Sequence, residues 1–167
     1  AGTFSWAYVL PYIVAQMLGG FFGAVLVYAF YKDHYDATDD PSTKLATFCT
    51  IPAIRNYGRN LFCEILGTVV LVFVILVLAT ESNTPEVGMG SLGAFPVAML
   101  IVALGMSLGG TTGYAINPAR DLAPRLAHAV LPIRGKGSND WAYSWVPVVG
   151  PIIGGFLAAG LYCLICC

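Results

Sequence analysis

The sequence predicts an all-α membrane protein, a bundle of four spanning helices and one half-helix that enters the membrane without crossing it. Three observations predict this fold class. Of the 167 residues, 57% are hydrophobic and only 10% are charged, whereas about 25% are charged in an average soluble domain. Four segments are long and apolar enough to cross a bilayer, which takes about 20 residues. The chain also contains an internal repeat.

The four apolar segments are predicted to span the membrane at residues 4–31, 61–79, 92–108 and 143–166. Because long apolar runs alternate with polar loops, residues 1–167 are expected to form a single membrane domain rather than several soluble ones. The loops are residues 32–59, which carry an acidic patch and are long enough to fold over a pore mouth, 80–91 and 132–141. With a net charge of −1 and no basic tract, no nucleic-acid partner is expected.

The half-helix is predicted at residues 118–130. At 1.5 Å per residue it is about 20 Å long, too short for a hydrocarbon core about 30 Å thick. Asn117 is suited to the N-cap and Pro118 to the first helical position. Residues 109–113, Gly-Gly-Thr-Thr-Gly, are expected to break the preceding helix at membrane depth. Non-helical backbone is tolerated there only when it is buried in protein or lines a water-filled cavity.

Arg120 is a lone charge in this apolar region, because no charged residue occurs between Glu86 and Arg120. An arginine at the centre of a membrane costs roughly 2.5–3.5 kcal/mol on insertion scales, so such residues usually face a cavity or a pathway. A helix that begins inside the membrane next to a charge predicts a pore.

The internal repeat appears when the chain is shifted by 135 residues. Trp6-Ala7-Tyr8 then matches Trp141-Ala142-Tyr143, and Gly19-Gly20-Phe21 matches Gly154-Gly155-Phe156. Three crossings separate the two copies, so they run in opposite directions, and inverted repeats place a binding site near the membrane midplane. The glycine pairs are interpreted as points of close helix packing. The counterpart of Asn117 in the first copy would lie upstream of residue 1, so we expect the chain to be an excerpt that lacks the first half-helix and the spans before it.

No cofactor and no metal site are expected. The five cysteines do not form a framework, and His34 and His128 stand alone. The cysteines at residues 163, 166 and 167 could bind a metal or be palmitoylated, but they have no histidine partner nearby. The cluster Cys163-x-x-Cys166-Cys167 is interpreted as small hydrophobic side chains within a span. No nucleophile–base pair is visible, so the chain is not expected to be an enzyme.

The stretch from Gly113 to Asp121, followed by Pro124-Arg125, resembles the second Asn-Pro-Ala loop of the major intrinsic protein (aquaporin) family. Within that family the chain is similar to the aquaglyceroporin branch and to bacterial glycerol facilitators, from the third span to the sixth. The resemblance implies an aquaporin-like inverted-repeat bundle. It also implies a passive channel for glycerol and other small neutral solutes and polyols, with some water, that excludes ions and protons. A homotetramer in the lipid bilayer of the bacterial cytoplasmic membrane is implied as well.

The resemblance also implies roles for particular residues. Arg120 and Tyr114 match filter positions, and Gly105 falls where water-selective channels have a bulky histidine, so the opening should be wider. The implied pore lining consists of the backbone carbonyls and the Asn-Pro-Ala motif, namely Gly113, Tyr114, Ala115, Ile116, Asn117, Pro118 and Ala119. The implied supporting residues are Asp121, Arg125, Pro147, Val148 and Glu64, which would accept hydrogen bonds from the pore-loop backbone. Two residues depart from the pattern, because Tyr114 replaces the more usual Phe and Ile51 lies where facilitators tend to have an aromatic.

Other interpretations stay open at this point. The chain could belong to a water-selective aquaporin, a proton-coupled transporter that uses Glu64, or a non-conducting structural member of the fold. Asn117 could be only an N-cap, Arg120 could pair with Asp121, and Tyr114 could be ordinary packing. Asp121 and Arg125 are spaced i,i+4 and are expected to stabilise the half-helix as a pair rather than touch a solute.

The orientation in the membrane has two conflicting indications. All eight Lys and Arg residues fall within residues 32–59 or 111–142, which the crossings place on one side, and the positive-inside rule would make that side cytoplasmic. Family topology instead puts the 32–59 loop outside. We follow the family, because the first spans usually set the orientation.

Overall fold

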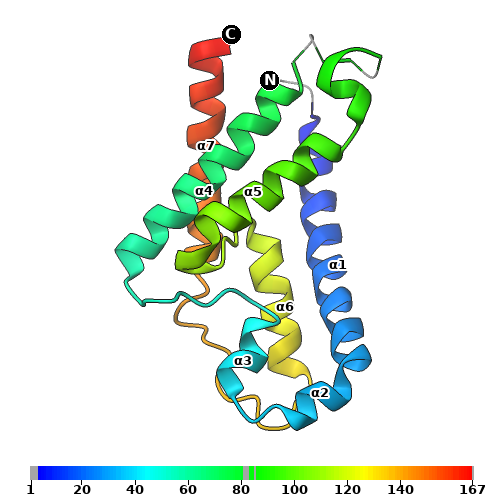
Figure 1. The fold of residues 1–167 in the computed structure, drawn as a ribbon, viewed down its shortest axis with the longest axis vertical. Helices are drawn as coiled ribbons and strands as arrows, with labels where there is room; N and C mark the ends of the chain where they lie inside the picture. The colour runs from blue at the N-terminus through cyan, green and yellow to red at the C-terminus, as the bar shows by residue number, and fades with distance from the viewer. Residues whose placement is uncertain (1–3, 81–82, 85, 167) are drawn as a thin grey trace.

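The computed structural model describes residues 4–80, 83–84 and 86–166, which form an assembly of helices (Figure 1). The long helices are α1 (Val9–Phe30), α4 (Tyr57–Leu78), α5 (Phe95–Thr112) and α7 (Val146–Cys166). The shorter elements are η1 (Trp6–Tyr8), α2 (Lys32–Ala37), α3 (Pro41–Ala46), η2 (Gly88–Leu92) and α6 (Pro118–Val130). The described residues contain no strand, so the all-α prediction is confirmed.

Four helical segments are long and apolar enough to cross a membrane, and they correspond to the four predicted spans. They are Trp6–Phe30, Tyr57–Leu78, Phe95–Thr112 and Val146–Ile165. The second begins earlier than predicted because Asn56 caps it, with the Asn56 side chain accepting a hydrogen bond from the Arg59 backbone N–H. The predicted half-helix is confirmed at the predicted bounds, as α6.

The end of α5 corrects one prediction. Residues 109–112 do not break the helix, which continues to Thr112, and only Gly113, with φ of 79°, ends it in the left-handed conformation. Gly109 serves close packing instead, because a Cβ at this position would lie 2.9 Å from Cδ1 of Tyr114. Gly109 is therefore compatible with a helix whose face must admit an aromatic ring.

The two copies of the repeat pack on different partners. The first copy, α1, lies along α6, and the second, α7, packs against α4 and also touches α6, while α4 contacts α5. In Figure 1, α1 descends from the N-terminal end of the molecule and α7 rises to the C-terminal end, so the two helices run in opposite directions, as the repeat predicted.

In each glycine pair of the repeat, only one glycine is a point of close helix packing. A Cβ on Gly20 would lie 3.0 Å from Cβ of Ala123 in α6, and one on Gly154 would lie 2.6 Å from the Ile65 carbonyl oxygen of α4. A Cβ on Gly19 or Gly155 would meet no described atom within 4 Å. The close-packing interpretation is therefore confirmed for Gly20 and Gly154 only.

The loop of residues 32–59, which contains α2 and α3, and the loop of residues 132–141 meet around the C-terminal end of α6 (Figure 1). A buried cluster forms there from Tyr28, Tyr35, Phe48, Ala127 and Ile133. The ammonium group of Lys136 donates to the carbonyl oxygens of residues 128, 129 and 131, at 2.6–2.9 Å. A cation at this place satisfies the last carbonyl groups of the helix and interacts favourably with its dipole.

His128, in the last turn of α6 and outside the four spans, makes this end of the molecule sensitive to acid. Its ring is fully buried, and Nδ1 lies 2.7 Å from Oδ1 of Asn139. Burial lowers the pKa of His128 below its ordinary value, and the nearby cations Lys136 and Arg125 lower it further. The fold therefore favours the neutral ring, and stability is lost as the pH falls below the ordinary histidine pKa of about 6.5 towards the folded-state pKa.

We expect the unfolding temperature to be lower at pH 5 than at pH 7.5, with each 1 kcal/mol lost corresponding to about 2–4 °C. Thermal unfolding in detergent at both pH values measures this. His128→Gln should reduce the pH dependence, whereas His34→Gln, at an exposed histidine of α2, should not. An unchanged pH dependence in His128→Gln would contradict the assignment.

Candidate functional site

The segment that joins α5 to α6 has an unusual backbone. After Gly113, the residues Tyr114 and Ile116 have φ values of 41° and 45°. Left-handed conformations at residues other than glycine cost about 1–3 kcal/mol each and persist only where the surroundings enforce them. The segment therefore needs specific support.

Glu64 of α4 supplies that support. Its Oε1 accepts hydrogen bonds from the Thr112 hydroxyl at 2.6 Å and the Ala115 N–H at 3.1 Å, and its Oε2 accepts one from the Ile116 N–H at 2.8 Å. The Glu64 side chain is completely buried. The hydrogen bonds that the resemblance implies for Glu64 are thus present, and Thr112 joins them.

The carbonyl groups of this segment differ from the N–H groups of Ala115 and Ile116, which are bound by Glu64. No described residue donates a hydrogen bond to the carbonyl oxygens of residues 113–116. With the N–H groups of Ala115 and Ile116 held by Glu64, these oxygens remain free to accept hydrogen bonds from another molecule.

The first turn of α6 is capped as the sequence predicted. Oδ1 of Asn117 accepts from the Ala119 N–H at 2.8 Å and from the Arg120 N–H at 3.4 Å, and Pro118 occupies the first helical position. The amide nitrogen of Asn117 lies 3.5 Å from Oε1 of Gln16 in α1. This end of α6 carries about +0.5 of an elementary charge from the aligned peptide dipoles.

Arg120 stands beside this helix end with a free guanidinium group. Within the described residues its side chain forms no ion pair and no hydrogen bond, and it is exposed. The alternative that Arg120 pairs with Asp121 is not supported, because Asp121 pairs with Arg125 instead.

Arg120 lines two cavities. One, of about 330 Å³, is lined by Leu71, Ile101, Tyr114, Ala115, Ile116, Asn117 and Arg120. The other, of about 340 Å³, is lined by Gly19, Gly20, Gly23, Ala24, Val27, Tyr35, Thr47, Phe48, Arg120 and Pro124. The structure therefore brings Tyr114, Asn117 and Arg120 together around one cavity and places Arg120 between that cavity and the α1 face.

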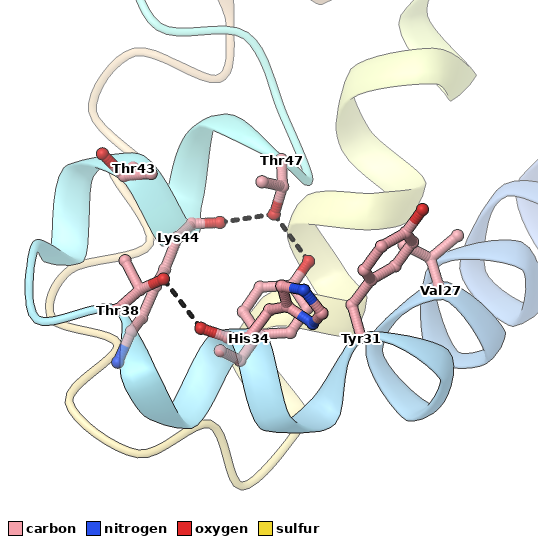
Figure 2. Close-up of a pocket in the computed structure, with 8 residues that line it drawn as sticks. Val27, Tyr31, His34, Thr38, Thr43, Lys44 and Thr47 are labelled. Carbon is pink, nitrogen blue, oxygen red and sulfur yellow. Dashed lines mark hydrogen bonds between the residues drawn. The ribbon is translucent and has the colours of Figure 1, made fainter.

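A third cavity, of about 240 Å³, lies beside the second and shares Val27, Tyr35 and Thr47 with it (Figure 2). Figure 2 shows the Thr47 hydroxyl bonded to the Lys44 carbonyl, and the Thr38 hydroxyl bonded to the His34 carbonyl. None of the site residues that the sequence predicted lines this cavity.

The ring of Tyr114 lies against two glycines of α5. A Cβ on Gly105 would be 3.0 Å from the Tyr114 hydroxyl and Cζ, and one on Gly109 would be 2.9 Å from Cδ1. The space that Gly105 leaves is thus occupied by the Tyr114 ring, so the width of the opening depends on both residues together. Gly109 was not among the predicted site residues, although its i,i+4 spacing from Gly105 puts both on one helix face.

Asp121 and Arg125 form a completely buried ion pair, with Nε to Oδ1 at 2.9 Å. Thr50 of the first loop donates its N–H and its hydroxyl to Oδ2 of Asp121, at 2.8 and 2.7 Å. Arg125 in turn donates to the carbonyl oxygens of Thr50, Asn139 and Asp140, at 2.8–3.1 Å. The predicted i,i+4 pair is confirmed, and neither residue lines the cavities at Arg120.

The remaining predicted residues lie away from these cavities. Pro147 is buried and Val148 partly buried at the start of α7, and neither they nor Gly105 line the two cavities at Arg120. The described residues contain no group of three His, Cys, Asp or Glu side chains that could hold a metal. Cys49 is buried, Cys63 partly buried and Cys163 exposed, while Cys167 and the Cys166 side chain lie outside the described part.

Comparisons with known proteins agree on the family. The family model described as Major intrinsic protein matches residues 1–162. The chain is 55% identical over 161 residues to the "Probable glycerol uptake facilitator protein" of Thermotoga maritima, covering 96% of this chain and 67% of that protein. It is 52% identical over 161 residues to the glycerol uptake facilitator protein of Bacillus subtilis, covering 96% of this chain and 57% of that protein.

A solved structure gives the same result for the fold. The aquaglyceroporin from Plasmodium falciparum matches with a TM-score of 0.83 at 28% identity, covering 98% of this chain and 66% of that one. The chain thus spans 57–67% of the length of these relatives. Together with the half-helix and its asparagine cap, these similarities establish that the chain belongs to the major intrinsic protein family.

Proposed function

We propose that this chain forms part of a passive membrane channel for glycerol and other small neutral solutes, with some water. The observation that carries the proposal is the cavity lined by Tyr114, Asn117 and Arg120, which combines side-chain donors, free backbone acceptors and an aromatic wall. Arg120 and the amide of Asn117 donate, the carbonyls of residues 114–116 accept, and the Tyr114 ring is apolar. The names of the relatives, glycerol uptake facilitators, support glycerol as the solute.

A polyol that enters a narrow pore must replace its hydrogen bonds to water. An unpaired hydroxyl in an apolar environment costs roughly 2–7 kcal/mol, depending on the reference state. A row of carbonyl acceptors facing a cationic donor offsets this cost step by step, so that the solute is not trapped. The aromatic ring can at the same time contact the carbon backbone of the polyol.

Exclusion of protons and cations follows from the same residues. The N-terminal end of α6 directs a partial positive charge at the cavity, and Arg120 adds a full charge that no described carboxylate pairs with. Positive helix ends and an arginine are the elements that exclude cations and protons in pores of this kind.

Three further assignments belong to this proposal. Residues 1–167 form one membrane domain of a longer channel, the channel resides in the cytoplasmic membrane of a bacterium, and it assembles as a homotetramer. The bacterial origin of both facilitators supports the membrane assignment. The homotetramer rests on the family resemblance alone. A transporter that relays protons through Glu64 is disfavoured, because that carboxylate is occupied by two backbone N–H groups and one hydroxyl.

Stopped-flow light scattering of proteoliposomes that carry the full-length protein tests the proposal. Glycerol entry should be faster than in empty vesicles, should not saturate and should be unaffected by a pH gradient. Arg120→Ala should increase proton leak while leaving the protein folded, because the Arg120 side chain is exposed and unpaired. Water permeation without glycerol permeation would instead support the water-selective alternative, and saturable uptake driven by a pH gradient would support the transporter.

A further inference from the structure

Thr50, in the loop between α3 and α4, touches both ends of the segment that joins α5 to α6. At one end lies Gly113, which terminates α5, and at the other lies Asp121, in the first turn of α6. The Thr50 side chain is buried, but it lines neither of the cavities at Arg120. An effect of Thr50 on these cavities must therefore be transmitted through the residues that it contacts.

Three hydrogen bonds hold Thr50 on α6. Its N–H and its hydroxyl donate to Oδ2 of Asp121, at 2.8 and 2.7 Å, and its carbonyl oxygen accepts from Arg125 at 3.1 Å. Hydrogen bonds in which one partner is ionised are shorter and stronger than neutral ones. The ion pair of Asp121 and Arg125 is also completely buried. Because solvent does not reach these groups, they fix the position of Thr50 relative to α6.

The other side of Thr50 lies against the end of α5. A Cβ on Gly113 would lie 3.2 Å from Cγ2 of Thr50 and 3.4 Å from its Cβ. Further along the same loop, the Ala53 N–H donates to the Thr111 carbonyl oxygen at 3.0 Å. The loop of residues 32–59 therefore holds the end of α5 by packing and by a backbone hydrogen bond, and it holds the start of α6 through the ion pair.

The segment between these two ends carries the free carbonyl groups of the candidate site. Glu64 holds the middle of the segment from the side of α4, through the N–H groups of Ala115 and Ile116. Thr50 connects the two ends from the side of the loop. Only the φ and ψ angles of the segment can absorb a change in the separation of its ends. Such a change would therefore turn the carbonyl groups that face the cavity.

We propose that Thr50 is a positioning residue for the filter loop, which we define as residues 113–117. Its hydrogen bonds to Asp121 and Arg125, together with its packing on Gly113, set the separation between the end of α5 and the start of α6. Thr50 thereby sets the directions of the filter-loop carbonyl groups, and with them the preference for glycerol over water. The consequence for transport rests on the proposed function.

The test compares Thr50→Val with Thr43→Val in full-length protein in proteoliposomes. Thr43 is the matched control, because its N–H and hydroxyl also donate to a single carboxylate oxygen, Oδ2 of Asp40, at 2.8 and 2.6 Å, but on the exposed surface. Thr50→Val should change the ratio of glycerol to water permeability by at least about twofold, the factor that corresponds to the smallest usual net contribution of a hydrogen bond. Thr43→Val should leave the ratio unchanged.

The ratio separates positioning from stability, because a smaller number of folded channels lowers both permeabilities equally above the lipid background. Thr50→Ser is the conservative variant, since it keeps the hydroxyl and the Cβ that lies against Gly113. It should restore most of the wild-type ratio. The proposal is wrong if Thr50→Val changes the ratio no more than Thr43→Val does, or if Thr50→Ser changes it as much as Thr50→Val.

Amide hydrogen exchange in detergent gives a second readout that does not depend on transport. The N–H groups of Ala115 and Ile116 should exchange faster in Thr50→Val than in Thr43→Val, because exchange reports local opening. Equal exchange rates would overturn the proposal even if glycerol is conducted. If wild-type vesicles conduct no glycerol but the rates differ, the proposed function fails and the positioning role of Thr50 stands. Should Thr50→Val not fold, Thr50→Ala, which leaves space for a water beside Asp121, takes its place with the same outcomes.

Discussion

Glu64→Gln is expected to reduce glycerol permeability per folded molecule by at least about tenfold, which corresponds to about 1.4 kcal/mol. The carboxylate accepts three hydrogen bonds, from Thr112, Ala115 and Ile116. An amide has only one oxygen, so its NH₂ group must face at least one N–H or O–H donor. Hydrogen bonds to charged groups contribute about 1.5–3 kcal/mol each, and without them the left-handed backbone at Tyr114 and Ile116 is no longer enforced.

The control for this variant is Glu86→Gln, at an exposed glutamate of the loop before α5. It should leave permeability at the wild-type level. Glycerol flux is measured in proteoliposomes with and without a pH gradient, and the loss in Glu64→Gln should be the same in both. A loss confined to gradient-driven uptake would mean that Glu64 carries protons and that the channel mechanism is wrong.

Asp121→Asn is expected to lower the stability of the folded protein by about 3–5 kcal/mol, the usual cost of removing one partner from a buried ion pair. The Arg125 guanidinium would remain completely buried without its carboxylate. Thr50 would also lose the carboxylate that accepts from its N–H and hydroxyl. The unfolding temperature in detergent should fall by about 6–20 °C, given about 2–4 °C per kcal/mol.

Asp36→Asn provides the comparison, because Asp36 pairs with Lys32 on the exposed surface of α2. Solvent screens that pair, so its loss should leave the unfolding temperature unchanged within error. The double substitution Asp121→Leu with Arg125→Met should recover much of the lost stability, since it buries no unpaired charge. If Asp121→Asn unfolds at the wild-type temperature, the pair does not stabilise the half-helix.

The half-helix shows what local sequence can predict well. An asparagine cap, a proline in the first turn and a short periodic segment are all local signals, and α6 begins and ends where they predict. The spans were equally accessible, because apolar length alone defines them. The ends of the spans were harder to predict. The second span begins at Tyr57 rather than after the charged residue Arg59, because Asn56 caps the helix.

The candidate site was predictable only in part, because some of its contacts join residues that are far apart in the sequence. Asn117 and Arg120 belong to one motif, and the structure places both at one cavity. The contact of Thr50 with Asp121 joins residues 71 positions apart, and no local pattern indicates it. The predicted break at residues 109–112 is wrong, because no local pattern indicates that the Tyr114 ring packs on Gly109.

The hydrogen bonds of Glu64 also bear on the order of folding. They join residues 48–52 positions apart, and closing such loops must precede any stabilisation that the contacts give. The strained conformations of Tyr114 and Ile116 can therefore persist only after α4 and α5 have docked. We expect the spanning helices to insert and pair first and the loop between α5 and α6 to take its shape last. In unfolding, selectivity should then disappear before the membrane spans separate.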